Sequence, residues 1–527
     1  MEKRKIAKKY KTRLPSNVEL LKVYHGLIKD KTPRQSKHGT GQGIKPSLKV
    51  ENLLRTRPIR SLSGIVNISV LTKPYPCPGV CIYCPSQKGA PKSYLDNEPA
   101  VMRAILNKYD PYKQVKMRIR ALEDTGHPTG KIELRIVGGT WSFYPKKYQT
   151  WFIKRCFEAC NDKNYTDVDF LPTAQKRNER AKYRIVGLSV ETRPDFINPE
   201  EVIRLRELGA TMVELGAQSI YDDILALNKR GHKVEATIKA TELLKDAGFK
   251  VLYQMMPNLP GSNIKKDERM FKELFSNPGF QPDLLKIYPC VLLKESPLYR
   301  HWKNKKYKPY TLANLINLVQ SIKKIVPYYV RIQRIIRDIP SQSIAAGPAK
   351  ISNLRQVVAF RSKKEGWRCR CIRCREVGEN YDPKEKLHIF RQNYEASGGQ
   401  EIFLSLENND RTKLYSLLRL RHIKNHSQHI LPVLKGVSII REVHTYGQLH
   451  SIGSSSPSGP QHKGLGKKLI KVAERITKKE FGLKKIAVIS GIGARDYYRK
   501  LGYKLEKNYM VKEKVPRGVR TRKSPVQ

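Results

Sequence analysis

Acidic residues are scarce in this chain of 527 residues, which has 47 Asp and Glu against 102 Lys and Arg. With a net charge of +55, the positive side chains repel one another, which favours a polyanionic partner. Nucleic acid is the leading candidate. Long hydrophobic runs are also missing. No run of about 18 apolar residues occurs, and residues 1–11 are a charge run without the apolar stretch of a secretory signal. We therefore expect a cytoplasmic protein that does not interact with membranes.

What is present is sufficient for folded domains. Hydrophobic residues make up 39% of the chain, which excludes a wholly disordered basic protein. The length suggests about two to four domains. The nine cysteines are an odd number, and six of them lie in two tight clusters. This pattern indicates metal sites in a reducing compartment.

Composition divides the chain into four segments. Residues 1–60 carry 17 Lys or Arg against four acidic residues and predict a basic N-terminal arm. Residues 61–345 alternate short β-branched runs with helical patterns. Residues 346–390 form a linker with a cysteine-rich loop, and residues 391–527 form a further domain that ends in a basic tail.

The second segment predicts a parallel sheet, because helical stretches separate its strand-like runs at 132–137, 184–190, 211–215, 250–255 and 284–288. One helix start is well marked by Asn198 as N-cap, Pro199 and Glu201. Repeated βα units of this kind are compatible with a complete or partial βα barrel or with a doubly wound sheet.

The last segment has a different order of elements. We expect strands at 413–421 and 437–443, a Gly/Ser/Pro loop at 451–463, a helix at 465–479 and a strand at 485–489. This order predicts a separate α+β domain.

The first cysteine cluster is Cys77-Pro-Gly-Val-Cys81-Ile-Tyr-Cys84, on a loop just after a predicted strand at 64–71. A four-iron cluster usually takes four cysteines, so three leave one iron open to the amine and carboxylate of an amino acid. This spacing, with Tyr83 before the last cysteine, is typical of radical S-adenosylmethionine enzymes. The alternative is a zinc loop that lacks its fourth ligand.

Downstream residues fit a cosubstrate site at the carboxyl ends of the strands, where barrel active sites are built. Glycine after a strand lets the backbone approach a ligand closely. For the charged residues among these candidates, the alternative interpretation is that they form structural salt bridges. The candidates are Gly138, Gly139, Thr140, Glu191, Arg193, Glu214 and Gln218.

A second motif, Gln461-His-Lys-Gly464-Leu465-Gly466-Lys467, enters the helix expected at 465–479. Small residues and free amides at a helix N-terminus suit a pyrophosphate. The segment 491–503 that follows contains Tyr497 and Tyr498, and this order matches the coenzyme A site of the GNAT acetyltransferase fold. In such a site, one tyrosine is a candidate acid near the thioester sulfur of the bound acyl-coenzyme A. The alternative interpretation is that a tyrosine packs in the core, which we expect for one of the two.

The third motif is Cys369-Arg-Cys371-Ile-Arg-Cys374 in the linker. Three thiols among arginines, which lower thiol pKa values, suggest a structural zinc or iron site. Its fourth ligand is open, with Cys290 or a histidine as options, and a basic loop without metal is the alternative.

Over residues 60–512 the chain closely resembles the family of Elongator catalytic subunits, in the single-chain form found in archaea and bacteria. The resemblance rests on the motifs above and on Glu98-Pro-Ala-Val-Met-Arg103, Tyr109-Asp-Pro111, Met256-Pro-Asn-Leu-Pro260, Arg337-Asp-Ile-Pro340 and Arg441-Glu-Val-His444. It implies a partial, TIM-like βα radical S-adenosylmethionine barrel followed by an α+β GNAT domain. It also implies that acetyl-CoA and a 5′-deoxyadenosyl radical convert the wobble uridine of tRNA to 5-carboxymethyluridine.

The resemblance also assigns roles. Cys77, Cys81 and Cys84 hold a [4Fe-4S] cluster, Lys131 contributes to acetyl-CoA binding, and Tyr498 lies beside the thioester. The pantetheine arm pairs with the strand Glu442, Val443, His444 and Thr445, and the pyrophosphate turn is Leu465, Gly466 and Lys467. Eukaryotic members have a longer insert between the first two cluster cysteines and lack the full linker motif.

The expected partner is the anticodon stem-loop of tRNA, bound by the basic arm and by the basic C-terminal tail. A homo-oligomer or accessory subunits are left open. Two other functions remain at this point. One is a protein-lysine acetyltransferase with a structural iron-sulfur domain, and the other is an RNA-binding assembly subunit with vestigial sites.

Overall fold

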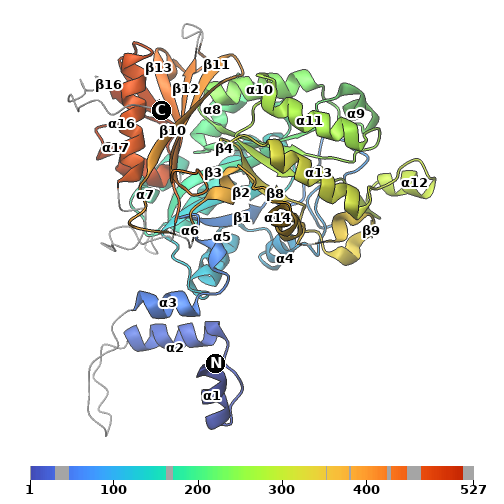
Figure 1. Cartoon of the computed structure of the whole chain (residues 1–527), viewed down its shortest axis with the longest axis horizontal. Helices are drawn as coiled ribbons and strands as arrows, with labels where there is room; N and C mark the ends of the chain where they lie inside the picture. Colours follow the sequence, from blue (N-terminus) through green and yellow to red (C-terminus); the bar gives the residue numbers. More distant parts are fainter. Residues whose placement is uncertain are drawn as a thin grey trace.

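The computed structural model describes residues 2–29, 47–161, 170–351, 353–378, 381–423, 429–447 and 464–513. Two seven-stranded sheets form the body, and a two-stranded sheet of β7 (Leu292–Leu293) and β9 (Ile344–Ala346) lies at its edge. Helices α1 (Glu2–Lys9), α2 (Asn17–Lys29) and α3 (Leu48–Leu54) project from the body (Figure 1). None of the helices in the described segments combines the length and hydrophobicity needed to cross a bilayer.

The first sheet is wholly parallel. Its strands lie in the order β1 (Val66–Leu71), β2 (Lys131–Val137), β3 (Arg184–Thr192), β4 (Met212–Gln218), β5 (Lys250–Met255), β6 (Leu284–Ile287) and β8 (Arg331–Ile335). The order never reverses, which excludes the doubly wound alternative. β1 and β8 are free edges, so the sheet is a partial barrel, as predicted.

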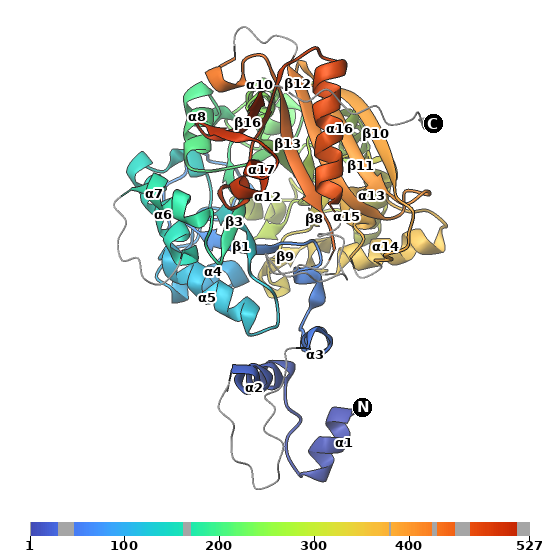
Figure 2. The ribbon, with the colours of Figure 1, turned by 90° about the vertical axis from the view of Figure 1, so that its left-hand side faces the viewer.

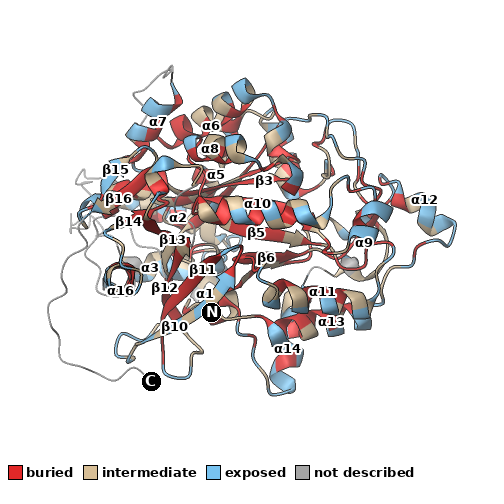
Figure 3. Cartoon of the chain, turned by 90° about the horizontal axis from the view of Figure 1, so that it is seen from above, coloured by how far each residue is buried: buried red, intermediate tan, exposed pale blue. Residues whose placement is uncertain are grey.

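Helices cover the outside of this sheet and bury one face each (Figure 3). They are α4 (Pro99–Leu106), α5 (Pro111–Glu123), α6 (Lys146–Cys160), α7 (Leu171–Asn178), α8 (Pro199–Glu207), α9 (Asp222–Leu227), α10 (Val234–Asp246), α11 (Ile264–Ser276), α12 (Leu298–Lys303), α13 (Leu312–Ile325) and α14 (Leu354–Lys364). The predicted start of α8 is confirmed, because the Asn198 side chain accepts a hydrogen bond from the Glu201 N–H at 2.8 Å.

The second sheet is mixed, in the order β10 (His388–Ala396), β11 (Gly399–Glu407), β12 (Leu414–Ile423), β13 (Val437–Thr445), β14 (Lys485–Val488), β16 (Tyr509–Glu513) and β15 (Lys504–Glu506). Helix α16 (Leu465–Lys479) lies across it, and α17 (Arg495–Arg499) follows β14 (Figure 2). The bounds of α16 are those predicted. β8, β10, β11, β15 and β16 were not predicted, and in β8 and β10 charged and polar residues break the apolar pattern.

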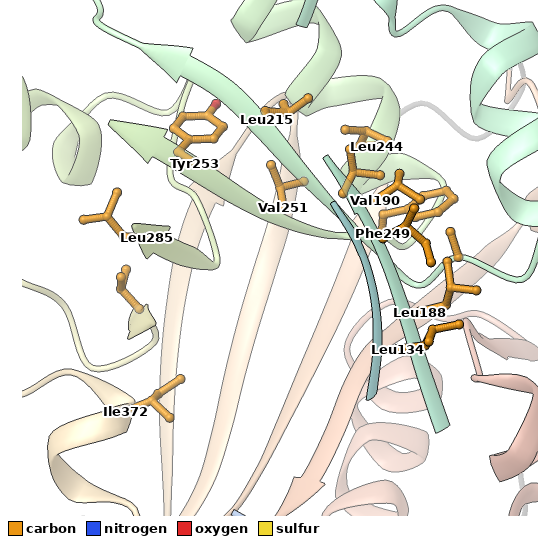
Figure 4. Close-up of a cluster of buried hydrophobic side chains, with 14 of the residues drawn as sticks. Leu134, Leu188, Val190, Leu215, Leu244, Phe249, Val251, Tyr253, Leu285 and Ile372 are labelled. Atoms are coloured by element: carbon orange, nitrogen blue, oxygen red, sulfur yellow. The ribbon is translucent and has the colours of Figure 1, made fainter. Parts of the chain in front are cut away.

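The hydrophobic core is continuous across the junction of the two sheets. The largest buried cluster contains Leu188, Val251 and Leu285 from the barrel together with Leu417 and Ile439 from the second sheet. Figure 4 shows the barrel part of this cluster. In the same view Ile372, from the linker helix α15 (Ile372–Arg375), points toward it. The second sheet and the linker therefore pack against the barrel as one body.

The amino-terminal ends of the barrel strands rest on the second sheet. Lys250, the first residue of β5, forms an ion pair with Glu442 of β13 at 3.3 Å. An added Cβ at Gly491 would lie 2.1 Å from the backbone oxygen of Val186 near the start of β3, so the two segments touch. This contact leaves the carboxyl ends of the strands, where the cysteine loop begins, at the opposite end of the barrel.

A buried carboxylate, Asp283, holds this junction together. It immediately precedes β6 and accepts hydrogen bonds from Arg441 of β13, and the charges of Arg419 and Lys245 lie 3.5 Å and 3.6 Å from it. All four side chains are at most 1% exposed. Burial alone would raise the pKa of Asp283, but Arg441, Lys245 and Arg419 outweigh burial and hold this pKa well below its ordinary value.

We expect Asp283→Ala to lower the free energy of unfolding by about 3–5 kcal/mol, because it leaves buried cations unpaired. The exposed pair Asp223–Lys266 offers a matched control, and Asp223→Ala should cost less than about 1 kcal/mol. Because the native pKa of Asp283 is lowered, its contribution is complete above the pKa of the unfolded chain, about 3.9, and is lost as the pH falls below it. Urea unfolding between pH 3 and 7 measures both effects, and equal stability of the two variants would contradict this role.

Candidate active site

The cysteine loop follows β1 at the carboxyl end of the barrel. The Cys77 sulfur lies 3.7 Å from the Thr140 hydroxyl, and Arg230 donates to the Cys81 sulfur at 3.8 Å. Burial, reinforced by the neighbouring Cys81, raises the pKa of the Cys84 thiol to about 11. Metal binding here would displace the thiol protons, as it does at other thiolate sites.

A cavity of about 600 Å³ opens beside this loop and is lined by all three cysteines. Five of the predicted cosubstrate residues line it as well: Gly139, Thr140, Glu191, Arg193 and Gln218. The structure thus brings together residues that are more than 130 positions apart in the chain. It also adds residues that the sequence analysis did not select, Tyr94, Arg230, Gln254 and Lys286.

Several buried polar atoms of the cavity wall have no hydrogen-bond partner among the described residues. They are Nη1 of Arg193, Oε1 of Gln218 and Nε of Arg230. Such atoms are rare in proteins, because each one costs desolvation energy. Unpaired donors and an acceptor beside three thiols fit the carboxylate and amine of S-adenosylmethionine together with an iron-sulfur cluster.

The two glycines after β2 have positive φ angles, +128° at Gly138 and +108° at Gly139. A Cβ at Gly138 would lie 2.2 Å from the Thr72 hydroxyl oxygen, so no other residue fits the turn without movement. Gly139 faces the main cavity, whereas Gly138 lies behind it in the turn.

The two predicted glutamates differ in their surroundings. Glu191 faces the cavity, where it accepts from the Tyr94 hydroxyl at 2.9 Å and pairs with Lys286 at 3.2 Å. Glu214 is fully buried and pairs with Arg135 at 2.7 Å and with Lys286. Burial would raise the pKa of Glu214, but these two cations outweigh it and lower the pKa to about 2. Glu214 therefore has the contacts of a structural ion pair, and cofactor binding by it stays a prediction.

The second candidate site lies where β13 and β14 separate. They pair as parallel strands from Val437 to Ile440, and the register ends at Ile440 opposite Val488. On the other side β13 stays paired with β12 as far as Thr445, with a bulge at Arg419/Leu420. One backbone edge of Glu442–His444 therefore has no strand partner within the described residues, and this edge can pair with the amides of a pantetheine chain.

The side chains of this strand are already engaged. Glu442 pairs with Arg419 at 2.8 Å and with Lys250, and His444 hydrogen-bonds the Ser63 carbonyl at 2.7 Å. Its side chains thus attach the strand to the barrel, so only the backbone edge remains for a ligand.

The first turn of α16 faces this strand edge. Gly464 is in the left-handed region at φ +69°, and a Cβ at Gly466 would lie 3.4 Å from Val443 and 3.3 Å from the Tyr497 hydroxyl. The turn therefore brings free N–H groups of Leu465, Gly466 and Lys467 close to β13. The remaining member of the motif, Gln461, lies outside the described residues.

The two tyrosines differ in exposure. Tyr498 is 6% exposed and packs in the core under α16, whereas Tyr497 is 42% exposed. Burial, helped by Tyr497 and Glu442, raises the pKa of Tyr498 above its ordinary value, which keeps its hydroxyl protonated. The Tyr497 hydroxyl thus lies beside Gly466 at the first turn of α16, whereas the Tyr498 ring packs in the core against Tyr497 and Tyr503.

Lys131 lies at the amino-terminal end of β2, paired in register with Arg184 of β3. A Cβ at Gly493 would contact Arg184, so this end of the barrel meets the segment before α17. Burial, reinforced by the charge of Arg184, lowers the pKa of Lys131 to about 8. The structure thus places Lys131 at the end of the barrel that faces the second sheet, away from the cysteine loop.

The linker cysteines converge. The sulfur atoms of Cys369, Cys371 and Cys374 all lie within 4.8 Å of one another, and no fourth His, Cys, Asp or Glu joins them in the described segments. Cys290 is not the fourth ligand, because it packs with Leu292 and Tyr307 in the cluster beside the first cysteine loop. Instead, the ammonium group of Lys323 donates to the Cys374 sulfur at 3.6 Å.

Comparisons with known proteins agree with this geometry. The radical SAM superfamily profile matches residues 75–274, and the Radical_SAM C-terminal domain profile matches residues 282–364. The chain is 47% identical over 478 residues to "tRNA uridine(34) acetyltransferase" of Methanocaldococcus infernus, covering 88% of each protein. It is 39% identical over 474 residues to human "Elongator complex protein 3", covering 87% of this chain and 86% of the human protein. The chain belongs to this family of radical SAM enzymes.

A solved structure supports the shared fold. Archaeal Elp3 of M. infernus, with an N-terminal deletion of residues 1–46, superposes with a TM-score of 0.75 at 44% sequence identity, over 86% of this chain and all of that one. The predicted fold, a partial barrel followed by an acetyltransferase-like sheet, is confirmed. Arg230 could not have been found from the sequence, because it follows a short helix with no recognisable motif and reaches the Cys81 sulfur only through the fold.

Proposed function

We propose that this chain modifies the wobble uridine of tRNA, using acetyl-CoA, S-adenosylmethionine and a [4Fe-4S] cluster to attach a carboxymethyl group to C5 of the base. One observation carries the proposal: a three-cysteine cavity and an open acetyltransferase-type strand edge occupy the two ends of one barrel. The names of the relatives add the substrate, uridine 34 of tRNA. A cytoplasmic location is part of this proposal.

Each site has its own set of residues. Cys77, Cys81 and Cys84 would hold the cluster, while Arg193, Gln218 and the Gly139–Thr140 backbone would orient S-adenosylmethionine. When bound, the cluster and cosubstrate supply a carbon-centred radical that can take a hydrogen atom from the acetyl methyl group.

The acetyl-CoA site would use backbone and proton donors. The Glu442–Thr445 edge would pair with pantetheine, and the first turn of α16 would bind pyrophosphate through its N–H groups. A tyrosine whose pKa is raised stays protonated and can donate to the departing thiolate when water cleaves the thioester. Tyr498 is our first choice for this role, and Lys131 lies at the same end of the barrel.

We expect purified, anaerobically reconstituted protein to form 5-carboxymethyluridine in unmodified tRNA when S-adenosylmethionine, reductant and acetyl-CoA are present. Nucleoside mass spectrometry measures the product. Cys81→Ala should abolish it, because the cluster loses one of three ligands, whereas Cys156→Ala, which removes a buried thiol far from the cavity, should retain it. Acetylated protein lysines without modified uridine would instead favour a protein acetyltransferase.

The basic arm is a further part of the proposal. Helices α2 and α3 pack together through the Tyr24 hydroxyl and Ser47, and α3 leads to Arg55, which donates to the Gly126 carbonyl at 2.7 Å. Leu21 of α2 also lies against Gly126, so the arm is attached through α2 and the end of α3, while most of α1 and α2 projects from the body (Figure 2). Its positive charge would bind RNA phosphates outside the active site.

Deletion of residues 1–46 should therefore raise the tRNA dissociation constant and flatten its dependence on salt, since fewer phosphates are neutralised. Fluorescence anisotropy at several KCl concentrations measures both quantities. Acetyl-CoA affinity serves as the control and should not change. Unchanged tRNA affinity in the deletion variant would refute a role for the arm.

We further propose that the linker cysteines bind zinc, with Lys323 offsetting part of the charge of three thiolates. Elemental analysis should find about one zinc per chain. Cys371→Ser should lose this zinc and retain the cluster absorbance, while Cys160→Ser, a buried cysteine outside the linker, should keep both. A wild-type protein that contains no zinc would contradict this assignment.

A further inference from the structure

The open edge of the barrel exposes a group of arginines beside β1. Arg57 and Arg60 belong to the turn that precedes β1, Arg103 lies on α4 and Arg118 on α5, and both helices pack against β1. All four line the cavity that also contains the three cluster cysteines. We call these four residues the arginine cluster.

The arginine cluster has no counter-charge among the residues that the structure describes. Within the described segments, none of the four forms an ion pair or a side-chain hydrogen bond, whereas Arg337, which lines the same cavity, is paired with Glu98 at 2.9 Å. Burial lowers the pKa of Arg118 to about 10, and the charges of Arg103 and Arg60 contribute. Even with this lowered pKa, the Arg118 guanidinium stays charged at neutral pH. The fold therefore concentrates like charges at one place, at a cost in stability.

The backbone supports the same conclusion. Arg57 has a φ of 53° and a ψ of 63°, in the left-handed region that a residue with a side chain adopts at an energetic cost. Backbone strain of this kind is often found where a ligand contacts the protein. Unpaired charges and a strained turn at one mouth of the cavity indicate a site for an anion.

We propose that the arginine cluster binds the phosphates that flank the nucleotide entering the cavity, so that the RNA strand crosses the barrel at its open edge between β1 and β8. The edge strands contribute Asn67 and Ser69 from β1 and Arg334 from β8 to the same cavity wall. A base that reaches the cysteine loop through this opening keeps its own phosphates close to the arginines. This inference rests on the proposed function for the identity of the polymer.

Coenzyme A also carries phosphates and is therefore the other ligand whose phosphates could bind to the arginine cluster. The first turn of α16, where its pyrophosphate is expected, contributes no residue to the cavity of the arginine cluster. Guanidinium groups bind phosphate oxygens in pairs and stack on bases, which suits a bent RNA strand. We therefore favour the RNA backbone.

The test compares two triple variants of the full-length protein with the same loss of charge. One is Arg60→Gln/Arg103→Gln/Arg118→Gln. The control is Lys113→Gln/Arg120→Gln/Lys147→Gln, whose residues are exposed on α5 and α6 and do not line the cavity. Binding of a fluorescent anticodon stem-loop RNA is followed by anisotropy from 50 to 300 mM KCl, without S-adenosylmethionine or acetyl-CoA.

We expect the arginine variant to bind the RNA at least about tenfold more weakly than the control variant, because charge-assisted contacts are lost. The slope of log Kd against log salt should fall by about 2, which corresponds to three phosphates of a single strand. The Tm of the arginine variant should equal or exceed that of wild type, since removing unpaired like charges relieves repulsion. A merely structural role for the arginines would lower it.

Three results would overturn the inference: equal RNA affinity of the two triple variants, weaker acetyl-CoA binding with unchanged RNA binding, and no RNA binding by the wild type. The second result would assign the cluster to the phosphates of coenzyme A. Failure of the proposed function is recognised separately. If the wild type modifies no uridine but the arginine variant binds RNA more weakly, the phosphate site stands and the proposed function fails. If the wild type modifies uridine and the arginine variant binds RNA as tightly as the control variant, the proposed function stands and only this inference fails.

Discussion

A single buried carboxylate, Asp283, sets the relative position of the two candidate ligand sites. It precedes β6 of the barrel and faces Arg441 and Arg419 of the second sheet and Lys245 of α10. Buried charges are tolerated only when they are paired with good geometry, so these side chains allow few alternative arrangements of the two sheets. The strand edge proposed for acetyl-CoA begins one residue after Arg441, and its place under the barrel follows from this network.

The interior of the barrel is also unusual. Closed βα barrels are filled by branched apolar side chains, whereas this partial barrel contains ion pairs along its axis. Glu442, Lys250 and Glu133 lie at the end that meets the second sheet, and Arg135, Glu214, Lys286 and Glu191 continue toward the cysteine loop. A polar interior of this kind connects the two sites and is consistent with their use in one reaction. The barrel is open between its edge strands β1 and β8, where we propose that the RNA strand enters.

The sequence was informative where local patterns are strong. Six barrel strands, helix α16 and the cysteine loop follow from alternation, capping residues and spacing, which depend on neighbours in the chain. β8 and β10 were missed because their polar residues are accommodated by tertiary contacts, such as the pair of Arg331 with Glu376. The engagement of Glu214 with Arg135 and Lys286 depends on three strands meeting, and no local signal indicates it.

The arginine cluster is a second feature that depends on tertiary structure and that no local sequence pattern indicates. Arg60 and Arg118 are two of 102 basic residues that nothing in the sequence distinguishes, and the motif that ends at Arg103 does not show that this side chain reaches the cavity. Only the fold shows that all three share a cavity with the cysteines and have no acidic partner among the described residues. High net charge indicated nucleic acid, while the location of the contact required the arrangement of α4 and α5 on the edge strand.

The central claim is that the acetyl group bound at one end of the barrel reacts with the radical formed at the other end. Acetyl-CoA with a deuterated, carbon-13 methyl group tests it directly, in a reaction with S-adenosylmethionine, reductant and tRNA. The account predicts deuterium in the 5′-deoxyadenosine released and carbon-13 in the side chain of the modified uridine. 5′-Deoxyadenosine without deuterium, or modified uridine without carbon-13, would contradict it.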